Sequence, residues 1–545
     1  MKFDRNIDIG SLEAEDDSFL INSFVSKADY KALEDTSNQK CIIIGRTGMG
    51  KSALIRKLHE SKENIARIKP EEMSLRFLSN SDILDYFRRL GISLDLFYKV
   101  LWKHVFIVEI LKLYYGEDKV KTGTKLQSLI ESVDFKFNKK KKNAIDYLRK
   151  WHDRFWENTE YRVKEIEDKL RESLKSSLGA DAKLYEDFAR AKVGVEAEKI
   201  IEKSKKTDVI HKAQKVVNDI QLAEISTILD IIQKDILPKT QKKFFIVIDD
   251  LDKHWVDKKI VYDLIVALVL CIKEINNCPN LKIVISLRLN LLQLALQKAN
   301  TTGFQREKFD NMFLHLYWNE SELKKLLQNR VDTLHKKHNE APVNIGEILP
   351  KDPGRGGKTD GFTYMLERSF YRPRDLISFF NKSIKYSSGS SKISREAINL
   401  AENDYSLERL NAIEDEWSEN YKFLKPYFDI LRSKPNRFKA EQITYKDIRK
   451  FCHTLYKTDI QLDSSFKHQL HYGWDKGKLN RNKKHVINIL YRIGCIGVKQ
   501  STQSSLMFSF HYNNTLDTFD INAEHVYYVN PAFHKTLVIK KEKTL

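Results

Sequence analysis

The chain has 545 residues, which is enough for about two to four domains with cores of their own. Hydrophobic residues make up 41% and aromatic residues 11% of the chain, and these fractions exclude an intrinsically disordered protein. Only 20 glycines and 10 prolines interrupt it, which favours long helices over an all-β or collagen-like structure.

Positive charge is concentrated near the C-terminus. The chain has 94 Lys and Arg against 75 Asp and Glu, a net charge of +19. Residues 431–545 alone carry 20 Lys and Arg against 9 Asp and Glu, so more than half of the excess lies in the last fifth. Such a field favours phosphate-rich or acidic partners, although a lysine-rich surface that serves solubility would give the same balance.

Cysteine usage and hydropathy predict a reduced, cytoplasmic protein. The five cysteines include no CxxC pair, which argues against a disulfide scaffold and a zinc ribbon. The first residues lack the apolar core of a signal peptide. The longest apolar run, Leu264–Ile272, is nine residues, about half of a membrane span. We therefore expect no membrane contact.

The first third of the chain predicts a leader and the start of an α/β core. Residues 1–40 are acidic and polar and form a leader. Residues 41–119 begin with an apolar strand at Cys41–Ile44, followed by a glycine-bearing loop, a helix at Ser52–Leu58 and a further helical pattern at 83–115. This segment is predicted to be the first part of the core.

Residues 120–240 are predicted to be a long insertion. Their charge-laced helical pattern fits an antiparallel hairpin or a coiled coil. The lysine run at 139–142 is predicted to be a solvated loop rather than a binding site. After the insertion, residues 241–319 return to the core, with a strand at Phe244–Ile248, a helix at Val261–Ile275 and a strand at Lys282–Leu287. This rhythm predicts a doubly wound parallel sheet.

The remaining segments predict a helical lid and a basic C-terminal domain. Residues 320–400 are helical apart from the glycine-rich loop at 354–357. Residues 401–545 contain helical patterns at 445–456 and 485–493, then strand-like runs at 506–512 and 526–529. Helices followed by a β-hairpin predict a winged-helix-like domain.

The strongest motif is a full match to the pattern GxxxxGK[ST]. Its glycines let the backbone curl, so that several amide N–H groups face one concavity that can hold a β-phosphate. The helix that follows directs the positive end of its dipole at the same charge. The strand before the motif and the helix after it are the context in which it binds phosphate. The predicted nucleotide-binding residues are Gly45, Arg46, Thr47, Gly48, Met49, Gly50, Lys51 and Ser52.

Two residues of this loop have separate roles. Lys51 is predicted to bridge the β- and γ-phosphates as a catalytic residue. The hydroxyl of Ser52 is predicted to be a ligand of Mg²⁺.

A second acidic site follows the strand at Phe244–Ile248. An apolar strand that ends in aspartate puts a carboxylate at the edge of the sheet, where it can hold a metal-bound water. We expect Asp249 to bind magnesium and Asp250, as a catalytic residue, to orient or deprotonate the attacking water. Asp252 either supports these carboxylates or caps the next helix.

Two arginines flank Pro373, at the predicted first turn of a helix. The helix dipole disfavours cations at this end, so an anionic partner such as the phosphates of a nucleotide would offset the placement of Arg372 and Arg374. Ion pairs with Asp375 or Glu367 are the alternative. The histidines 471, 485, 511, 525 and 534 lack ligand spacing, so no metal other than nucleotide-bound Mg²⁺ is predicted.

Together, the loop, the insertion, the Ile248–Asp252 run and the Arg372–Ile377 segment resemble the prokaryotic KAP-like P-loop ATPases and their STAND and AAA+ relatives. The chain is more closely similar to soluble P-loop ATPases of bacterial anti-phage defence clusters, in which segments like Leu101–Lys103 and Tyr491–Gly497 recur. The insertion of KAP proteins often carries membrane helices, whereas this one is charged.

The resemblance implies an α/β P-loop NTPase fold with a doubly wound parallel sheet, ATP and Mg²⁺ as cofactors, and an ATP-driven switch in antiviral defence. It also implies that Arg288, which follows a core strand, is a catalytic residue that senses the γ-phosphate. A surface arginine is the alternative.

Three functions follow from these observations. The first is an ATPase switch that couples nucleotide state to a protein partner or effector. The second is a DNA-engaging ATPase, a loader or sensor, with phosphate contacts from Lys478, Arg481, Lys483 and Lys484. The third is a nucleotide-bound scaffold without turnover, against which the aspartate pair argues. A guanine-reading motif is absent, which favours ATP, and an arginine supplied by another copy would make the protein a homo-oligomer.

Overall fold

The computed structural model describes residues 1–73, 94–116, 139–151, 222–253, 255–256, 258–299, 306–354, 359–418, 420–421, 423–457, 479–511, 522 and 524–540. The chain forms two compact units, each with its own hydrophobic core. The sheet unit comprises Lys27–Gly45 and Leu54–His315. The helical unit comprises Met1–Ser26, Arg46–Ala53 and Leu316–Leu545.

The sheet unit is built on a five-stranded parallel sheet with the order β2-β3-β4-β1-β5. The residues of β1, β3 and all but the last of β4 are buried, as expected for strands that helices cover on both faces. The strands predicted at 41–44, 244–248 and 282–287 are confirmed to within one residue. The strands are β1 (Ile42–Gly45), β2 (Ile65–Ile68), β3 (Phe244–Ile248), β4 (Leu281–Arg288) and β5 (Phe313–His315).

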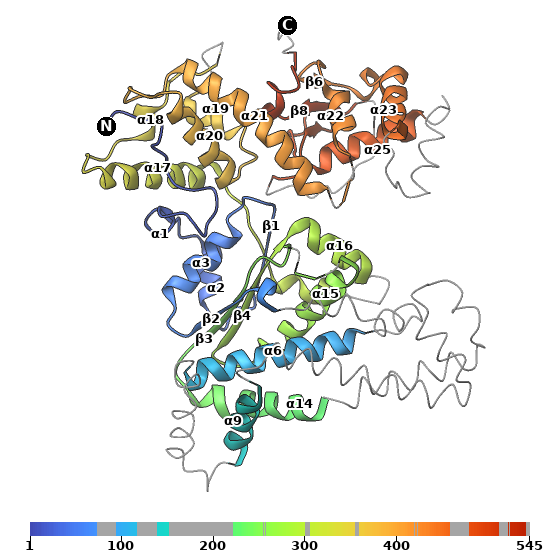
Figure 1. The fold of residues 1–545 in the computed structure, drawn as a ribbon. Coiled ribbons are helices and arrows are strands. Elements are labelled where there is room, and N and C mark those ends of the chain that lie inside the picture. Colours follow the sequence, from blue (N-terminus) through green and yellow to red (C-terminus); the bar gives the residue numbers. More distant parts are fainter. Residues whose placement is uncertain are drawn as a thin grey trace, which may run out of the picture. The chain divides into compact units, whose positions relative to one another are not determined.

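The strand register brings three chain segments to one edge of this sheet. Strand β4 lies between β1 and β3 (Figure 1). Gly45, the last residue of β1, pairs with Arg288, the last residue of β4. Ile248, the last residue of β3, pairs with Ile285. The carboxyl ends of β1, β3 and β4 therefore meet at the same edge, where ligands bind in open α/β sheets.

Helices cover both faces of the sheet, as predicted for a doubly wound fold. In Figure 1, α2 and α3 lie on one side of the strands and α15 and α16 on the other. Helix α6 packs on α15, and the indole N–H of Trp102 donates to the carbonyl of Leu264 at 2.9 Å. The bounds are α2 (Ala28–Glu34), α3 (Lys51–Ser61), η1 (Pro70–Met73), α6 (Asp95–Tyr115), α15 (Lys258–Ile275), α16 (Leu289–Ala299) and η5 (Arg306–Met312).

Of the predicted insertion at 120–240, the structure describes residues 139–151 and 222–240. They form α9 (Lys139–Trp151) and α14 (Leu222–Ile231), which is followed by the π-helical turn η2 (Ile232–Ile236) and the 3₁₀ turn η3 (Leu237–Lys239). Helices α9 and α14 pack on each other and on α6. The coiled-coil prediction for 152–221 lies outside the described residues.

The prediction that the lysine run at 139–142 is a loop is wrong. These residues form the first turn of α9. Ala144, Ile145 and Leu148 lie at helical spacing and are buried on one face of α9. Their burial stabilises a helix that includes the charged first turn.

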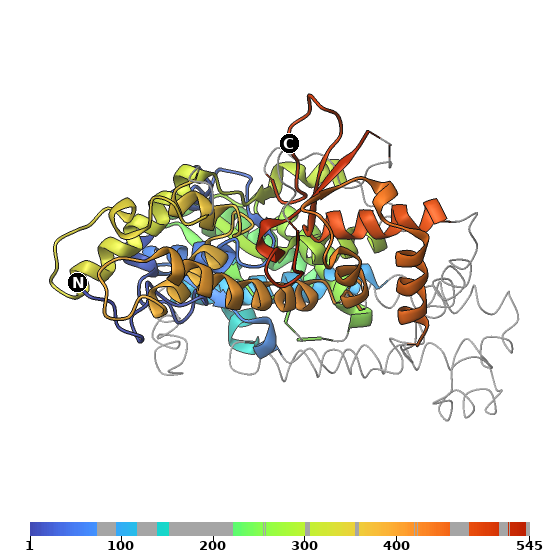
Figure 2. The same cartoon turned by 90° about the horizontal axis from the view of Figure 1, so that it is seen from above.

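The helical unit contains a group of helices over the segment that was predicted to be a lid. Helix α17 begins with a capping box formed by Asn319 and Glu322, and α20 begins at Pro373, as predicted. Helix α21 runs without a break across the predicted boundary at residues 400 and 401, from the α17–α20 group to the C-terminal elements (Figures 1 and 2). The bounds are α17 (Glu320–Lys337), α18 (Ile345–Ile348), α19 (Gly361–Leu366), α20 (Pro373–Lys385) and α21 (Arg395–Trp417).

Over the described part of residues 423–540, the C-terminal elements are three α-helices, two 3₁₀ turns and a three-stranded antiparallel sheet with the order β6-β8-β7. The winged-helix-like domain stays a prediction. The bounds are α22 (Lys425–Leu431), β6 (Arg437–Phe438), η6 (Ala440–Gln442), α23 (Tyr445–Lys457), α25 (Leu479–Arg492), β7 (Ile496–Lys499), β8 (Val526–Val529) and η9 (Pro531–Phe533).

The strand predicted at 506–512 is wrong over its described part, 506–511. There, Met507 alone forms a bridge, to Val498. Strand β8 pairs instead with β7, which buries Ile496 and Val498. The rings of Phe508 and Phe510 stack, with their centres 5.1 Å apart.

The predicted leader divides between the two units. Residues Met1–Ser26, including α1 (Leu20–Ser23), belong to the helical unit, and α2 belongs to the sheet unit. None of the described helices is both long and apolar enough to cross a bilayer.

Candidate functional site

The glycine-bearing motif forms a loop between β1 and α3. Strand β1 ends at Gly45 and α3 begins at Lys51. Gly48 and Gly50 have φ angles of +80° and +94°, a region that side chains disfavour. A Cβ atom on Gly48 would lie 2.9 Å from the Cβ of Arg374, so glycine is also required for space. We call residues 45–52 the phosphate loop.

Two side chains of the phosphate loop contact its own backbone or neighbouring elements. The Lys51 ammonium donates to the carbonyl of Arg46 at 3.2 Å. The Arg46 guanidinium is 8% exposed and donates to the carbonyl of Arg492 and the hydroxyl of Ser509. Burial and the charge of Arg372 lower the pKa of Arg46 to about 10.

Three residues of the helical unit, all later in the sequence than the loop, donate hydrogen bonds to the loop backbone. The guanidinium of Arg372 donates to the carbonyl of Thr47 at 3.0 Å, and the amide of Arg374 donates to the carbonyl of Gly48 at 3.3 Å. The indole N–H of Trp318 donates to the carbonyl of Met49 at 2.9 Å. The structure thus brings Arg372 and Arg374 to the loop. Sequence analysis missed Trp318, whose only signal is its place just before the Asn319 helix cap.

The side chain of Arg372 is enclosed. It is 0% exposed, and its Nη1 lies 2.9 Å from the Glu416 carboxylate. Sequence analysis offered Asp375 or Glu367 as ion-pair partners of the two arginines. In the structure, Arg372 pairs with Glu416 instead, and Asp375 pairs with Arg409. Burial raises the pKa of Glu416, but the guanidiniums of Arg372, Arg409 and Arg46 outweigh it and lower the pKa to about 2. Glu416 is therefore a charged group at neutral pH.

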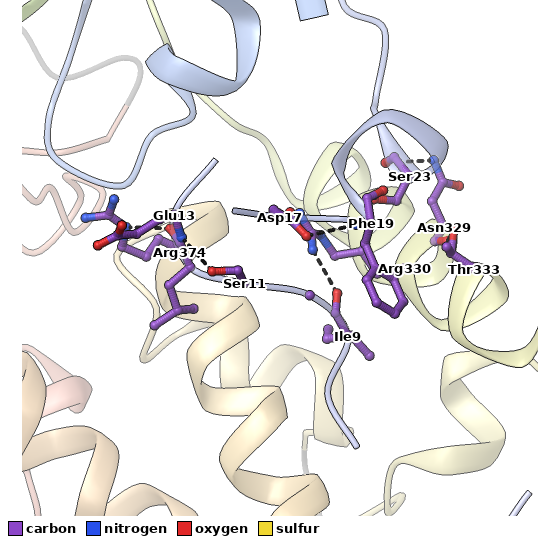
Figure 3. A network of polar contacts seen from close by, with 12 residues as sticks. Ile9, Ser11, Glu13, Asp17, Phe19, Ser23, Asn329, Arg330, Thr333 and Arg374 are labelled. Carbon is purple, nitrogen blue, oxygen red and sulfur yellow. Dashed lines mark hydrogen bonds and ion pairs between the residues drawn. The ribbon is translucent and has the colours of Figure 1, made fainter. Parts of the chain in front are cut away.

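Arg374 contacts the N-terminal segment. Its Nε donates to the carbonyl of Leu12 at 3.1 Å. Figure 3 shows this segment lying against α17. There, Arg330 directs its guanidinium to the carboxylate of Asp17 and to the carbonyl of Ile9, at 2.5 and 2.8 Å. The predicted leader therefore contacts Arg374, which sequence analysis predicted to bind nucleotide.

Asp249 follows β3 in the sheet unit and is 4% exposed. The Ser286 hydroxyl donates to its Oδ1. Its Oδ2 is buried and has no hydrogen-bond partner among the described residues. Sequence analysis missed Ser286, although a single hydroxyl within the otherwise apolar run Ile283–Leu287 was a signal.

The next carboxylates have cationic neighbours. Asp250 has a φ of +60°, a strained conformation that clusters at functional sites, and its carboxylate lies 2.9 Å from Lys253 Nζ. Asp252 forms an ion pair with Arg288, whose side chain is 36% exposed at the end of β4. The geometry therefore gives Asp252 a partner and ties Arg288 to the same sheet edge as Asp249.

The oxygen donors at the end of β3 fit a magnesium ion. A buried carboxylate oxygen without a partner costs free energy that a bound cation removes, and carboxylate and hydroxyl oxygens are the donors that Mg²⁺ prefers. Over the described parts of the chain, no group of three His, Cys, Asp or Glu side chains is arranged to hold another metal.

Comparison with known proteins gives one partial family match and one curated relative. The model of the FunZ-associated C-terminal helical domain matches residues 321–414. A "Putative transposon gamma-delta 80.3 kDa protein" of Escherichia coli (strain K12) is 22% identical over 510 residues. The match covers 92% of this chain but 62% of that relative, so the chain spans less than two thirds of its length.

Among solved structures, the chain is similar to a Walker-type ATPase of Pyrococcus abyssi, at 11% identity and a TM-score of 0.34, over 89% of this chain and 93% of that one. It is also similar to Cdc6p from Pyrobaculum aerophilum, at 12% identity and a TM-score of 0.20, over 61% and 75%. The parallel sheet, with the phosphate loop at the end of β1, makes this an α/β P-loop NTPase fold with helical domains.

Proposed function

We propose that the protein is an ATP-binding and ATP-hydrolysing molecular switch. The observation that carries this proposal is the buried, unpartnered Oδ2 of Asp249 at the carboxyl edge of the sheet from which the phosphate loop departs. Arg288 ends the strand between them. A phosphate-binding loop and a carboxylate at one sheet edge are the two parts that nucleotide hydrolysis requires.

Each residue of this proposal has one task. The loop amides and Lys51 bind the phosphates, while Ser52 and Asp249 would hold magnesium, which would supply positive charge against the phosphates. Asp250 orients the attacking water and accepts its proton. The pair that Arg288 forms with Asp252 keeps its guanidinium at this edge, where it senses the γ-phosphate.

The switch acts through the lid. Arg372 and Arg374 contact the loop backbone, so a change in the loop on nucleotide binding alters the lid contacts. The output is a change in how the chain engages a protein partner or effector. A role in antiviral defence rests on the motif resemblance alone.

The test is phosphate release from ATP by the full chain. Wild type releases phosphate in the presence of magnesium, and Asp250→Ala retains nucleotide binding but loses turnover by about 10²–10⁴-fold. Asp230→Ala, which changes an exposed aspartate of α14, is the matched control and keeps wild-type turnover. Normal hydrolysis by Asp250→Ala would refute its assigned role.

A second candidate function is DNA engagement through the C-terminal elements. Basic side chains with helical spacing are exposed on α23, and further ones on α25. The name of the Escherichia coli relative links that protein to a transposon, a DNA element. Lys478 lies outside the described residues, and Lys483 is half-buried. The exposed residues are Lys446, Arg449, Lys450, His453, Arg481 and Lys484.

Duplex DNA titration against salt tests this candidate. Log affinity should fall with log salt by about 0.9 for each phosphate contact, and Lys446→Glu with Lys450→Glu should weaken binding. Lys392→Glu, an exposed lysine of the same unit, is the control. Absence of binding at about 50 mM salt would remove DNA engagement and leave the ATPase proposal intact.

A further inference from the structure

Arg46 belongs to the phosphate loop, but its side chain ends among C-terminal elements of the helical unit. Its Nη2 donates to the carbonyl of Arg492 at 2.9 Å and to the hydroxyl of Ser509 at 2.8 Å. Its guanidinium lies 5.6 Å from the ring centre of Trp417. One side chain therefore contacts the last residue of α25, the connection between β7 and β8, and the last residue of α21.

The backbone of the same residue receives the lysine of the loop. The Lys51 ammonium donates to the Arg46 carbonyl at 3.2 Å. A phosphate oxygen is a charged acceptor and competes strongly with a peptide carbonyl for an ammonium group. Phosphate binding therefore acts directly on the peptide that carries the Arg46 side chain.

A second path joins the loop to the end of α21. Arg372 bonds both the Thr47 carbonyl and the Glu416 carboxylate, at 3.0 and 2.9 Å. Glu416 precedes Trp417, which lies beside the Arg46 guanidinium. Arg46 thus reaches Trp417 directly, while Arg372 joins Thr47, the next residue of the loop, to Glu416, the preceding residue of α21.

The backbone just before Arg372 is strained. Phe370 and Tyr371 both have a φ of +52°, a conformation that persists only where its surroundings enforce it. The Phe370 ring centre lies 5.1 Å from the Arg372 guanidinium and 4.8 Å from the ring of Phe510. Phe510 follows Ser509, so the same segment is contacted from the loop and from the lid.

We propose that Arg46 is a positioning residue that couples phosphate binding in the loop to residues 493–511 of the helical unit. This inference rests on the proposed function, in which the loop binds nucleotide. When phosphate draws Lys51 from the Arg46 carbonyl, the Arg46 peptide moves and its side chain loosens its hold on Arg492 and Ser509. Residues 493–511 then open more often and present a different surface to a partner.

Hydrogen exchange of the full chain tests this coupling, with and without magnesium and a non-hydrolysable ATP analogue. In wild type, the analogue should raise exchange in peptides of 493–511 by about tenfold. Arg46→Gln should exchange at the raised rate without the analogue and should no longer respond to it. Arg46→Lys keeps the charge but not the planar fork, and should give an intermediate response. Arg395→Gln, at the exposed start of α21, should respond as wild type does.

Calorimetry on the same samples distinguishes a failure of the coupling from a failure of the proposed function. Wild type that binds the analogue without a change at 493–511, or Arg46→Gln that responds as wild type does, overturns the coupling and leaves the proposed function standing. Wild type that gives no binding heat overturns the proposed function and the coupling with it. If Arg46→Gln does not fold, Ser509→Ala removes one acceptor of Arg46 and should show raised basal exchange and a reduced response. An unchanged response in that variant overturns the coupling.

Discussion

Arg372 and Glu416 form an ion pair that solvent does not reach: Nη1 lies 2.9 Å from the carboxylate, and the two side chains are 0% and 4% exposed. The same Nη1 bonds the Thr47 carbonyl of the phosphate loop. To contact a phosphate itself, Arg372 would have to leave a buried carboxylate. We therefore propose that Arg372 affects nucleotide binding indirectly, through its hydrogen bond to the loop backbone.

Removing the charge of Glu416 should destabilise the helical unit. Glu416→Gln leaves buried guanidiniums without their carboxylate, and breaking such a pair costs about 3–5 kcal/mol. Urea unfolding measures the loss. Glu408→Gln, on the exposed side of α21 with Lys382 as its partner, should change stability by at most about 1 kcal/mol. Equal effects of the two substitutions would contradict the buried cluster.

The same carboxylate predicts an acid dependence. The guanidiniums hold the pKa of Glu416 at about 2 in the folded protein, below its ordinary value of 4.5. A lowered carboxylate pKa contributes stability that is fully present above the unfolded pKa and is lost as pH falls towards the folded pKa. Wild type should therefore lose stability between pH 4.5 and about 2 more steeply than Glu416→Gln does. Parallel curves from acid titrations of thermal unfolding would be inconsistent with this cluster.

The N-terminal segment should depend on its buried ion pair. Asp17 and Arg330 are 2% and 4% exposed, and Asp17→Ala leaves the Arg330 charge buried and unpaired. We expect a loss of about 3–5 kcal/mol and faster proteolysis of residues 1–26. The double substitution Asp17→Leu with Arg330→Met should recover much of the loss, because it removes both charges. A double variant as unstable as the single one would show that packing, and not charge, holds the segment.

Asp249 should be required for magnesium. Its Oδ2 is buried and lacks a partner among the described residues, so Asp249→Asn removes the charge that holds the cation. The variant should bind nucleotide with little dependence on magnesium, while wild type should gain at least about tenfold in affinity from the metal. Asp230→Asn is the control. Unchanged magnesium dependence in Asp249→Asn would exclude it as a ligand.

Sequence patterning predicted those parts of the fold that local chemistry determines. Buried parallel strands are short apolar runs, so β1, β3 and β4 could be located from Ile43, Val247 and Val284 and their neighbours. The phosphate loop was predictable because its backbone has positive φ at Gly48 and Gly50, where side chains are disfavoured. The glycines that this conformation needs therefore recur at a fixed spacing in the motif.

The remaining contacts depend on partners distant in sequence. Glu416 lies 44 residues from Arg372, and Ser509 lies 463 residues from Arg46. No periodicity relates such pairs, since tertiary packing alone brings them together. For the same reason, the helical pattern around residue 400 did not reveal that α21 continues through the boundary assigned there.

The central claim is that the phosphate loop binds a triphosphate through Lys51. Calorimetric titration of Mg²⁺ and ATP into the full chain tests it most directly. We predict a one-site isotherm for wild type and, for Lys51→Ala, an affinity lower by about 30–160-fold, from the loss of a charged hydrogen bond worth about 2–3 kcal/mol. Wild type that produces no heat, or Lys51→Ala that binds as wild type does, would contradict the account.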